Sequence, residues 1–183
     1  MDPYRKRSFI REVTPYVLFA GVIYLVLTYA YNIVYVPTES MAPQIQAKSL
    51  CFGLRYPYLK EEKIKVSRGD VVIFWNEEKG KILCKRVIGM PGETVTFENG
   101  DVYVDGKLLE QDYASEKHTS FSNRTFRIPE GSVLCLGDNR LHSSDARHLK
   151  NPYTPIADLK ARITMSISLP TVHFHDKTTE GSF

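Results

Sequence analysis

The sequence predicts a mainly β protein, built of antiparallel sheets, with one transmembrane helix at its N-terminus. Two observations carry this prediction. One long uncharged run stands near the N-terminus, and the rest of the chain consists of short apolar runs separated by turn residues. The length of 183 residues and the 25% of charged side chains fit one compact domain with appendages.

The uncharged run extends from Val13 to Val36 and contains 24 residues. As a helix it would be about 36 Å long, enough to cross a hydrocarbon layer of ~30 Å. Several of its five tyrosines stand near its ends, where aromatic side chains favour the membrane interface. The charged residues before it are mostly basic, Arg5, Lys6, Arg7 and Arg11 against Asp2 and Glu12. The positive-inside rule therefore predicts a cytoplasmic N-terminus and places everything after Val36 outside.

Two other interpretations of this run fit the residues less well. A cleaved signal peptide would have a shorter apolar core and a cleavage site with small residues, but Tyr35-Val36-Pro37 follows instead. A buried core helix would usually have one polar face, and this run has none. We therefore expect a cytoplasmic N-terminus over 1–12, an uncleaved transmembrane anchor over 13–36, an extracytoplasmic domain over 37–172 and a mobile tail over 173–183.

The expected strands lie between clear turn signals. Asn99-Gly100 stands between two apolar runs and is a strong hairpin signal, because both central residues of such a turn must adopt positive φ. Only the segment 155–160 looks helical. The runs that we interpret as strands are Val71–Trp75, Lys81–Ile88, Thr94–Phe97, Val102–Val104, Ser132–Leu136 and Ala161–Leu169.

Charge and cysteine usage exclude several classes of protein. The net charge is only +3, and the basic residues are scattered among acidic ones, so we expect no nucleic-acid partner. Cys51, Cys84 and Cys135 each stand in an apolar run and read as small buried hydrophobic residues. Neither they nor the histidines have the spacing of metal ligands, so we expect no metal and no cofactor.

Ser40 is a candidate nucleophile because of where it stands. It follows the expected membrane span by only a few residues, within the stretch 37–43. Its hydroxyl should therefore lie close to the outer membrane surface. A protease at that position could reach the end of a membrane-embedded substrate segment and little else.

Lys85 is a candidate base because of the strand that carries it. On an alternating strand it shares a face with Leu83 and Val87, and burial without a partner is rare for lysine. Desolvation lowers the pKa of a buried lysine from ~10.4 by up to ~3–5 units, which would make a neutral amine available to take the proton of Ser40. Alternation alone leaves open that Lys85 extends to solvent at the strand edge, because the opposite face is also largely apolar.

Four stretches of the chain stand out: Ser40–Pro43, Arg68–Val72, Lys85–Glu93, and Gly137–Arg140 followed by Ser143, Asp145 and Arg147. In this order they resemble the signature boxes of bacterial type I signal peptidases. Four boxes in order after an N-terminal span are far more specific than any one of them. The resemblance covers about Tyr16 to Leu169 and implies a signal-peptidase-like β-fold. Because the segment from Asp105 to Ile128 is short, we expect the accessory domain of larger members to be missing, and in this the chain resembles the compact single-span enzymes of Gram-positive bacteria.

The resemblance implies a role for each matching residue. Ser40 would be the nucleophile, Lys85 the general base, and Ser143 the hydroxyl that orients the lysine amine. Thr38 would donate to the oxyanion together with the backbone N–H of Ser40. The remaining implied residues are Met41 in the substrate cleft, and two structural ion pairs, Asp145 with Arg147 and Arg86 with Asp138.

The chain departs from the family pattern in two places. Ala146 stands where the family often has serine, and Gln44-Ile45 replaces the more familiar Thr-Leu. Ala146 does not stand at a proton-transfer position and is close to serine in volume, so we expect activity to survive there. We expect the change at Gln44-Ile45 to alter local packing. His142 stands next to Ser143, but the base position of the family is filled by Lys85, and we do not expect His142 to be catalytic.

The resemblance implies a membrane-bound serine endopeptidase that removes N-terminal signal peptides from exported preproteins at the plasma membrane. Its expected partners are those signal peptides, the lipid bilayer and the secretion translocon. Two alternatives stay open: a dedicated peptidase for one client, such as a pilin or conjugation protein, and a non-catalytic assembly chaperone on the same fold. A self-cleaving repressor with the same chemistry would have an N-terminal helix-turn-helix, and the membrane span stands there instead.

Overall fold

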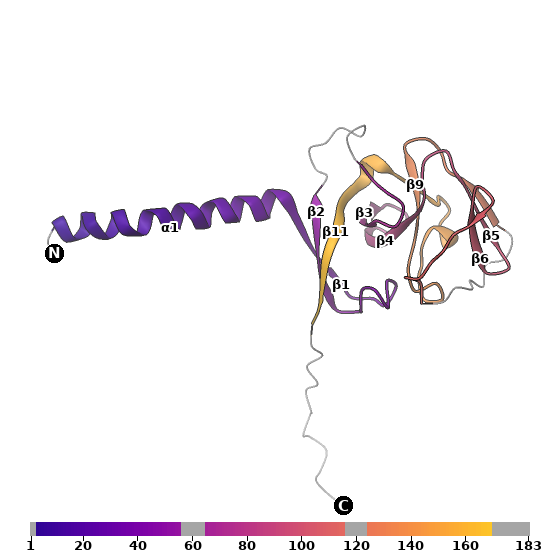
Figure 1. Ribbon diagram of the computed structural model, residues 1–183, viewed down its shortest axis with the longest axis horizontal. Helices are drawn as coiled ribbons and strands as arrows, with labels where there is room; N and C mark the ends of the chain where they lie inside the picture. Colours follow the sequence, from indigo (N-terminus) through magenta and orange to yellow (C-terminus); the bar gives the residue numbers. More distant parts are fainter. Residues whose placement is uncertain (1–2, 56–64, 116–123, 170–183) are drawn as a thin grey trace, which may run out of the picture.

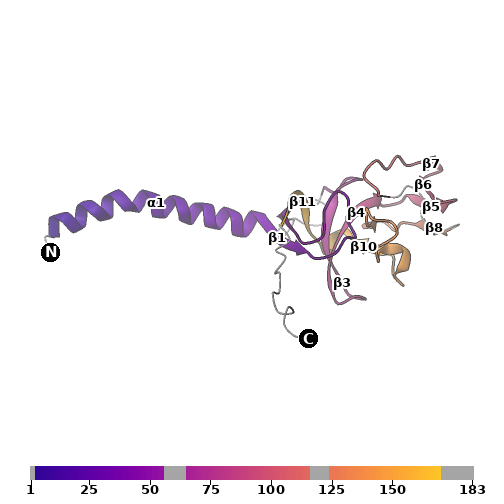
Figure 2. The same ribbon diagram turned by 90° about the horizontal axis from the view of Figure 1, so that it is seen from below.

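The computed structural model describes residues 3–55, 65–115 and 124–169. A long helix, α1, stands away from a β-rich domain in two perpendicular views (Figures 1 and 2). The mainly antiparallel architecture with one N-terminal apolar helix confirms the predicted fold class. The expected mobile tail over 173–183 lies outside the described residues.

Helix α1 extends from Pro3 to Ala30 and ends six residues earlier than the uncharged run. The next six residues, Tyr31–Val36, form strand β1. The expected helical anchor over 13–36 is therefore wrong at its C-terminal end. The physical reason is that residues 31–36 pair along their whole length with β2, Ser49–Arg55, a partner that the local sequence does not reveal. The apolar part of α1, Ile10–Ala30, still contains 21 residues, about 32 Å of helix.

The larger sheet has seven strands in the order β1-β2-β11-β3-β4-β9-β10, and its pairings are antiparallel. Strand β4 pairs with β3 along most of its length, but its pairing with β9 begins only at Arg86. The other strands of this sheet are β3 (Val71–Asn76), β4 (Lys81–Gly89), β9 (Ser132–Leu136), β10 (Tyr153–Pro155) and β11 (Leu159–Ser168).

A second sheet has four strands in the order β7-β6-β5-β8 and lies at the end of the domain farthest from α1 (Figure 1). Its hairpin turn at Asn99-Gly100 has φ of 51° and 89°, which confirms the predicted turn. Its strands are β5 (Thr94–Glu98), β6 (Asp101–Val104), β7 (Lys107–Leu108) and β8 (Arg124–Arg127).

The six predicted strands are all present, whereas β1, β2, β7, β8 and β10 were not predicted. The expected helix over 155–160 is wrong: only Ile156–Asp158 form a single 3₁₀ turn, η3, between β10 and β11. A second 3₁₀ turn, η2, covers Ala146–His148.

The hydrophobic core consists of three clusters of buried side chains, and β4 contributes to all of them. Leu83 and Val87 pack in the cluster of β3, β9 and β11, while Cys84 packs on the other side with residues of β1 and β2. Ile88 packs against the four-stranded sheet. Most of β4 is therefore buried, with core residues on both of its faces.

Candidate active site

Ser40 lies in a tight loop directly after β1. The loop is closed by backbone hydrogen bonds from Ala42 N–H to Glu39 and from Ile45 N–H to Met41. A third bond, from Asn139 N–H to the Ser40 carbonyl at 3.2 Å, ties the loop to the segment that follows β9. The Ser40 side chain is consequently held in place with only 8% of the residue exposed.

Lys85 is 3% exposed on β4, and its side chain reaches Ser40. The distance from Lys85 Nζ to Ser40 Oγ is 2.7 Å, and Nζ also donates to the Cys84 carbonyl at 2.9 Å. The alternation left open that the amine lies in solvent at the strand edge; the structure places it inside, against the serine. When the amine is neutral, the same contact allows the Ser40 hydroxyl to donate to the nitrogen lone pair.

Burial lowers the pKa of Lys85 from its ordinary value, because removal of water disfavours the ammonium form. No carboxylate lies within ion-pair distance of Nζ among the described residues, so no close negative charge reverses this effect. The arrangement therefore provides a desolvated amine next to a hydroxyl, the pairing that activates a serine nucleophile.

The two expected helper hydroxyls differ in how they are placed. Thr38 Oγ1 is 3.4 Å from Ser40 Oγ, so it lies at the site on the exposed side of the loop. Ser143 is buried, but its Oγ has no hydrogen-bond partner of ordinary geometry among the described residues. The expected hydrogen bond between Ser143 and the Lys85 amine is therefore not formed, and the amine contacts Ser40 and Cys84.

Gly137 is a site residue whose role the sequence analysis missed. A Cβ atom at this position would lie 2.1 Å from Ser143 Oγ and 2.5 Å from the Ser40 carbonyl oxygen. Its own N–H donates to Asp145, and its carbonyl accepts from the buried Arg140. Gly137 is therefore the point where the two loops of the site touch. The sequence signals were a glycine directly after an apolar strand and its place at the start of the box Gly137–Arg140, and neither revealed this contact.

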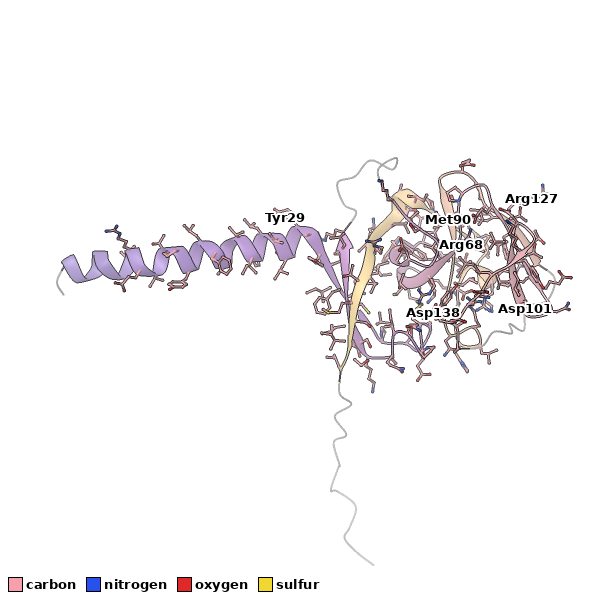
Figure 3. All side chains as sticks on the ribbon, viewed as in Figure 1. Tyr29, Arg68, Met90, Asp101, Arg127 and Asp138 are labelled. Carbon is pink, nitrogen blue, oxygen red and sulfur yellow. The ribbon has the colours of Figure 1, made fainter. Side chains whose placement is uncertain are left out.

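Both expected ion pairs are formed by two hydrogen bonds each. Arg147 donates from Nε and Nη2 to Asp145, with a shortest distance of 2.8 Å. Arg86 donates from Nε and Nη2 to Asp138, with a shortest distance of 2.6 Å. Figure 3 shows Asp138 in the interior of the domain. Burial alone would raise the pKa of Asp145, but Arg147 and the Gly137 N–H hold it below its ordinary value.

Comparison with known proteins decides the family. Residues 7–167 match the family described as signal peptidase, peptidase S26. The signal peptidase I P of Bacillus subtilis subsp. natto is 32% identical over 79% of this chain and 82% of that protein. The chain belongs to the peptidase S26 family. The signal peptidase I of Streptococcus pneumoniae is 26% identical over 78% of this chain and 86% of its own. A crystal structure of a signal peptidase I from Enterococcus faecalis V583 is 30% identical, covers 55% of this chain and 97% of its own, and has a TM-score of 0.48.

Membership of the S26 family confirms the resemblance that the motifs carried, and with it the class of serine peptidase. The side chain of Met41, next to the nucleophile of this S26 chain, lies in the core. Met41 was expected in the substrate cleft, but it is fully buried in the core cluster of Val36, Ile45 and Cys51. The side chain points inward because the loop 39–45 turns back on itself directly after Ser40.

The family departure at Ala146 is compatible with the S26 site, because its side chain packs in the core next to β9 rather than toward Ser40. His142 is exposed, and its imidazole lies 3.3 Å from Asn139. No cluster of three potential metal-ligating side chains occurs in the part of the chain that the structure describes.

Proposed function

We propose that this chain is a membrane-bound endopeptidase that removes N-terminal signal peptides from exported preproteins by acyl transfer through Ser40 and Lys85. The observation that carries the proposal is the buried contact of 2.7 Å between Ser40 Oγ and Lys85 Nζ. The names of the relatives, signal peptidase I in each case, support the substrate class. They give no support to a single-client peptidase or to a non-catalytic chaperone.

The neutral Lys85 amine takes the Ser40 proton while Oγ attacks the scissile carbonyl carbon, which gives a tetrahedral oxyanion and an ammonium. The C–N bond then breaks, and the ammonium returns its proton to the leaving amine. An acyl ester on Ser40 remains. Water attacks this ester with Lys85 again as base, which releases the new carboxyl end and restores Ser40. No metal takes part in these steps.

The oxyanion needs donors aimed at the place where charge develops. The backbone N–H of Ser40 and the hydroxyl of Thr38 are the two groups that we assign to this role. Thr38 Oγ1 lies 3.4 Å from the nucleophilic oxygen, close to where the oxyanion would form. Loss of one such donor costs about 3–4 kcal/mol of transition-state stabilisation in other hydrolases.

The open edge of β4 can bind an extended peptide. Val87 exchanges backbone hydrogen bonds with Gly69 and Asp70 on the β3 side. Backbone groups alternate along a strand, so those of Ile82 and Cys84 point to the opposite edge, where β9 does not begin to pair until Arg86. A substrate segment can therefore add as a strand beside Ser40, with main-chain hydrogen bonds for affinity.

In this proposal the catalytic site lies at the surface of the bilayer. In both views the rest of the domain lies on the far side of β1, β2 and β11 from α1 (Figures 1 and 2). The outer face of these strands is apolar across two rows of paired residues, Ile33-Phe52-Met165 and Tyr35-Leu50-Ile167. A face of this kind, next to an apolar helix, fits the interface of a bilayer better than water.

Tyr29 lies near the end of α1, next to the sheet (Figure 3). In the proposed orientation its side chain would lie at the membrane–water interface, where tyrosine is favoured. The basic residues before α1 favour a cytoplasmic N-terminus and an extracytoplasmic catalytic domain at the plasma membrane. The secretion translocon is the partner that we expect to deliver substrates there.

The test is cleavage of a purified preprotein by the full-length protein in detergent micelles, with the product masses measured. The proposal predicts one cut at the end of the signal peptide, and loss of that cut in Ser40→Ala and in Lys85→Met. Cleavage that persists in either variant would contradict it. Leu108→Ala, on β7 in the other sheet, serves as the control that should cleave normally.

A further inference from the structure

The segment Gln111–Ser115 connects the four-stranded sheet to the active site. It follows β7, and the side chains of Leu109 and Tyr113 pack, partly buried, against the core cluster of that sheet. The segment turns tightly, because the Ala114 N–H donates to the Gln111 carbonyl at 3.2 Å. It therefore leaves the sheet as a fixed turn and not as an open chain.

The backbone of this segment holds the peptide group between Asp138 and Asn139. The Ser115 N–H donates to the Asp138 carbonyl at 3.0 Å. The N–H of the same peptide group, that of Asn139, donates to the Ser40 carbonyl at 3.2 Å. Because a peptide group is planar, its carbonyl cannot turn without turning the N–H that holds Ser40. The position of the nucleophile is therefore linked to Ser115 through one rigid group.

The same segment also contacts the nucleophile loop directly. Ala114 forms an antiparallel bridge with Pro43, which follows Ser40 in the loop. The loop is thus held from two sides, at the Ser40 carbonyl through the peptide group described above and at Pro43 through this bridge. A movement of the segment would act on the loop at both contacts.

Tyr113 fixes the segment on the strand that carries the base. The guanidinium of Arg86, the residue after Lys85, lies over the Tyr113 ring, with Cζ 4.2 Å from the ring centroid. The same guanidinium donates from Nε and Nη2 to Asp138 and from Nη1 to the Gly69 carbonyl. The Arg86 side chain is only 12% exposed, and stacking of a cation on an aromatic ring is strongest when water is excluded. The ring and the ion pair therefore hold the segment and the base strand together.

We propose that Tyr113 and the backbone N–H of Ser115 are positioning groups that hold Ser40 in line with its base. This inference rests on the proposed function, which supplies the reaction. Neither group contacts the reacting atoms. Because they act through other groups, their loss should disturb the geometry of the attack and not the binding of substrate.

A proline at residue 115 tests the backbone hydrogen bond, because it removes the N–H. It also favours an extended residue before it, which is compatible with the bridge of Ala114. Full-length Ser115→Pro and Ser115→Ala proteins in detergent micelles are compared on one preprotein. We expect Ser115→Pro to lower kcat about tenfold or more with KM unchanged. Ser115→Ala, which keeps the N–H and removes only a hydroxyl contact of 3.4 Å to Asp138, should lose far less.

Variants of Tyr113 test the anchor of the segment. Tyr113→Leu removes the ring, so we expect the same loss of kcat, whereas Tyr113→Phe keeps the ring and should retain most of the activity. Tyr103→Leu, at a half-buried position of β6, is the control that should cleave as wild type does. Each kcat is divided by the fraction of chains that an acylating β-lactam finally labels on Ser40, so that unfolded protein does not count.

Several results would overturn the proposal. One is equal kcat in wild type and Ser115→Pro, and another is an equal loss in Ser115→Pro and Ser115→Ala. A rise in KM with kcat unchanged would assign the segment to substrate binding. Equal losses in Tyr113→Phe and Tyr113→Leu would exclude the ring contact, and this pair decides the proposal if the proline variant does not fold. No cleavage by wild type would instead contradict the proposed function.

Discussion

The missing side chain of Gly137 makes room for the carbonyl oxygen of Ser40. A Cβ at residue 137 would lie 2.5 Å from that oxygen and 2.1 Å from Ser143 Oγ, distances that real side chains do not occupy. The loop that carries the nucleophile therefore rests on a glycine that follows β9. The position of Ser40 is therefore sensitive to a single methyl group at residue 137, although that residue takes no direct part in the reaction.

Gly137→Ala should displace Ser40 relative to the Lys85 amine. A displacement near 1 Å can cost about 100-fold in rate, so we expect kcat to fall by at least that factor while the protein remains folded. The measurement is kcat on a preprotein, with circular dichroism as the check on folding. The control is Gly106→Ala, where a Cβ meets no atom within 4 Å although φ is 76°. That variant should lose stability but not activity, and equal kcat values for the two variants would contradict this account.

The dependence of activity on pH follows from the burial of Lys85. Only the neutral amine can accept the Ser40 proton, so kcat/KM should fall as the pH drops through the pKa of Lys85. Because burial lowers that pKa, the midpoint of the acid limb should lie below 10.5, the ordinary lysine value. The measurement is kcat/KM from pH 5 to 11 at constant ionic strength, with about a tenfold fall per pH unit on the acid side. A limb centred at or above 10.5 would mean that the amine is not desolvated.

Lys85→Met should inactivate the protein and also stabilise it. The substitution keeps the volume of the side chain but removes a buried ionisable group, so the free energy of unfolding at pH 7 should rise. In wild type, the unfolded chain binds a proton that the fold does not bind between the lowered pKa and 10.5, so wild-type stability increases with pH across that interval. The gain from Lys85→Met should therefore shrink as the pH approaches 10.5. Denaturant unfolding of both proteins at pH 7 and pH 10 tests this. A gain in unfolding free energy that is larger at pH 10 than at pH 7 would contradict the prediction.

Asp145→Asn should destabilise the domain strongly, because it leaves the Arg147 guanidinium buried opposite a neutral amide. Both side chains of this pair are at most 1% exposed. Breaking a buried pair in this way costs about 3–5 kcal/mol of unfolding free energy. Asp70→Asn is the control, since Asp70 is 3.7 Å from a partly exposed Arg162, and it should cost less than about 1 kcal/mol. Similar losses in the two variants would show that burial of the pair is unimportant.

The apolar outer face of β1, β2 and β11 should contact lipid. In a Trp75→Phe background, a tryptophan at Ile167 should be quenched by lipids brominated near the head group once the full-length protein is reconstituted into vesicles. A tryptophan at Leu108, on the remote sheet, should not be quenched. Equal accessibility of both tryptophans to a water-soluble quencher would place the face in water.

Local sequence was sufficient for elements that are determined by local chemistry. The turn at Asn99-Gly100 requires positive φ at both residues. The apolar runs between turn signals became strands, whether one face is buried, as in β5, or both, as in β4. The end of α1 could not be found in this way. Residues 31–36 are as apolar as the helix before them, and only their pairing with β2 makes them a strand.

The same limit applies to the site. The order of the motifs was enough to select Ser40 and Lys85, and the structure brings these side chains together. The pattern of apolar and polar residues along β4 did not show that the Lys85 side chain is buried, because β4 has core residues on both of its faces. The importance of Gly137 and the inward position of Met41 depend on contacts between segments far apart in the sequence.

The most direct measurement is the rate at which Ser40 is acylated. An active-site-directed acylating β-lactam is added to the full-length protein, and the modified residue is identified by mass spectrometry of its peptides. We predict that wild type carries one acyl group on Ser40 and that Lys85→Met acquires it at least about 1000-fold more slowly, because its nucleophile has lost the base. Acylation of another residue, or equal rates in the two proteins, would contradict the assignment of Lys85 as the base of Ser40.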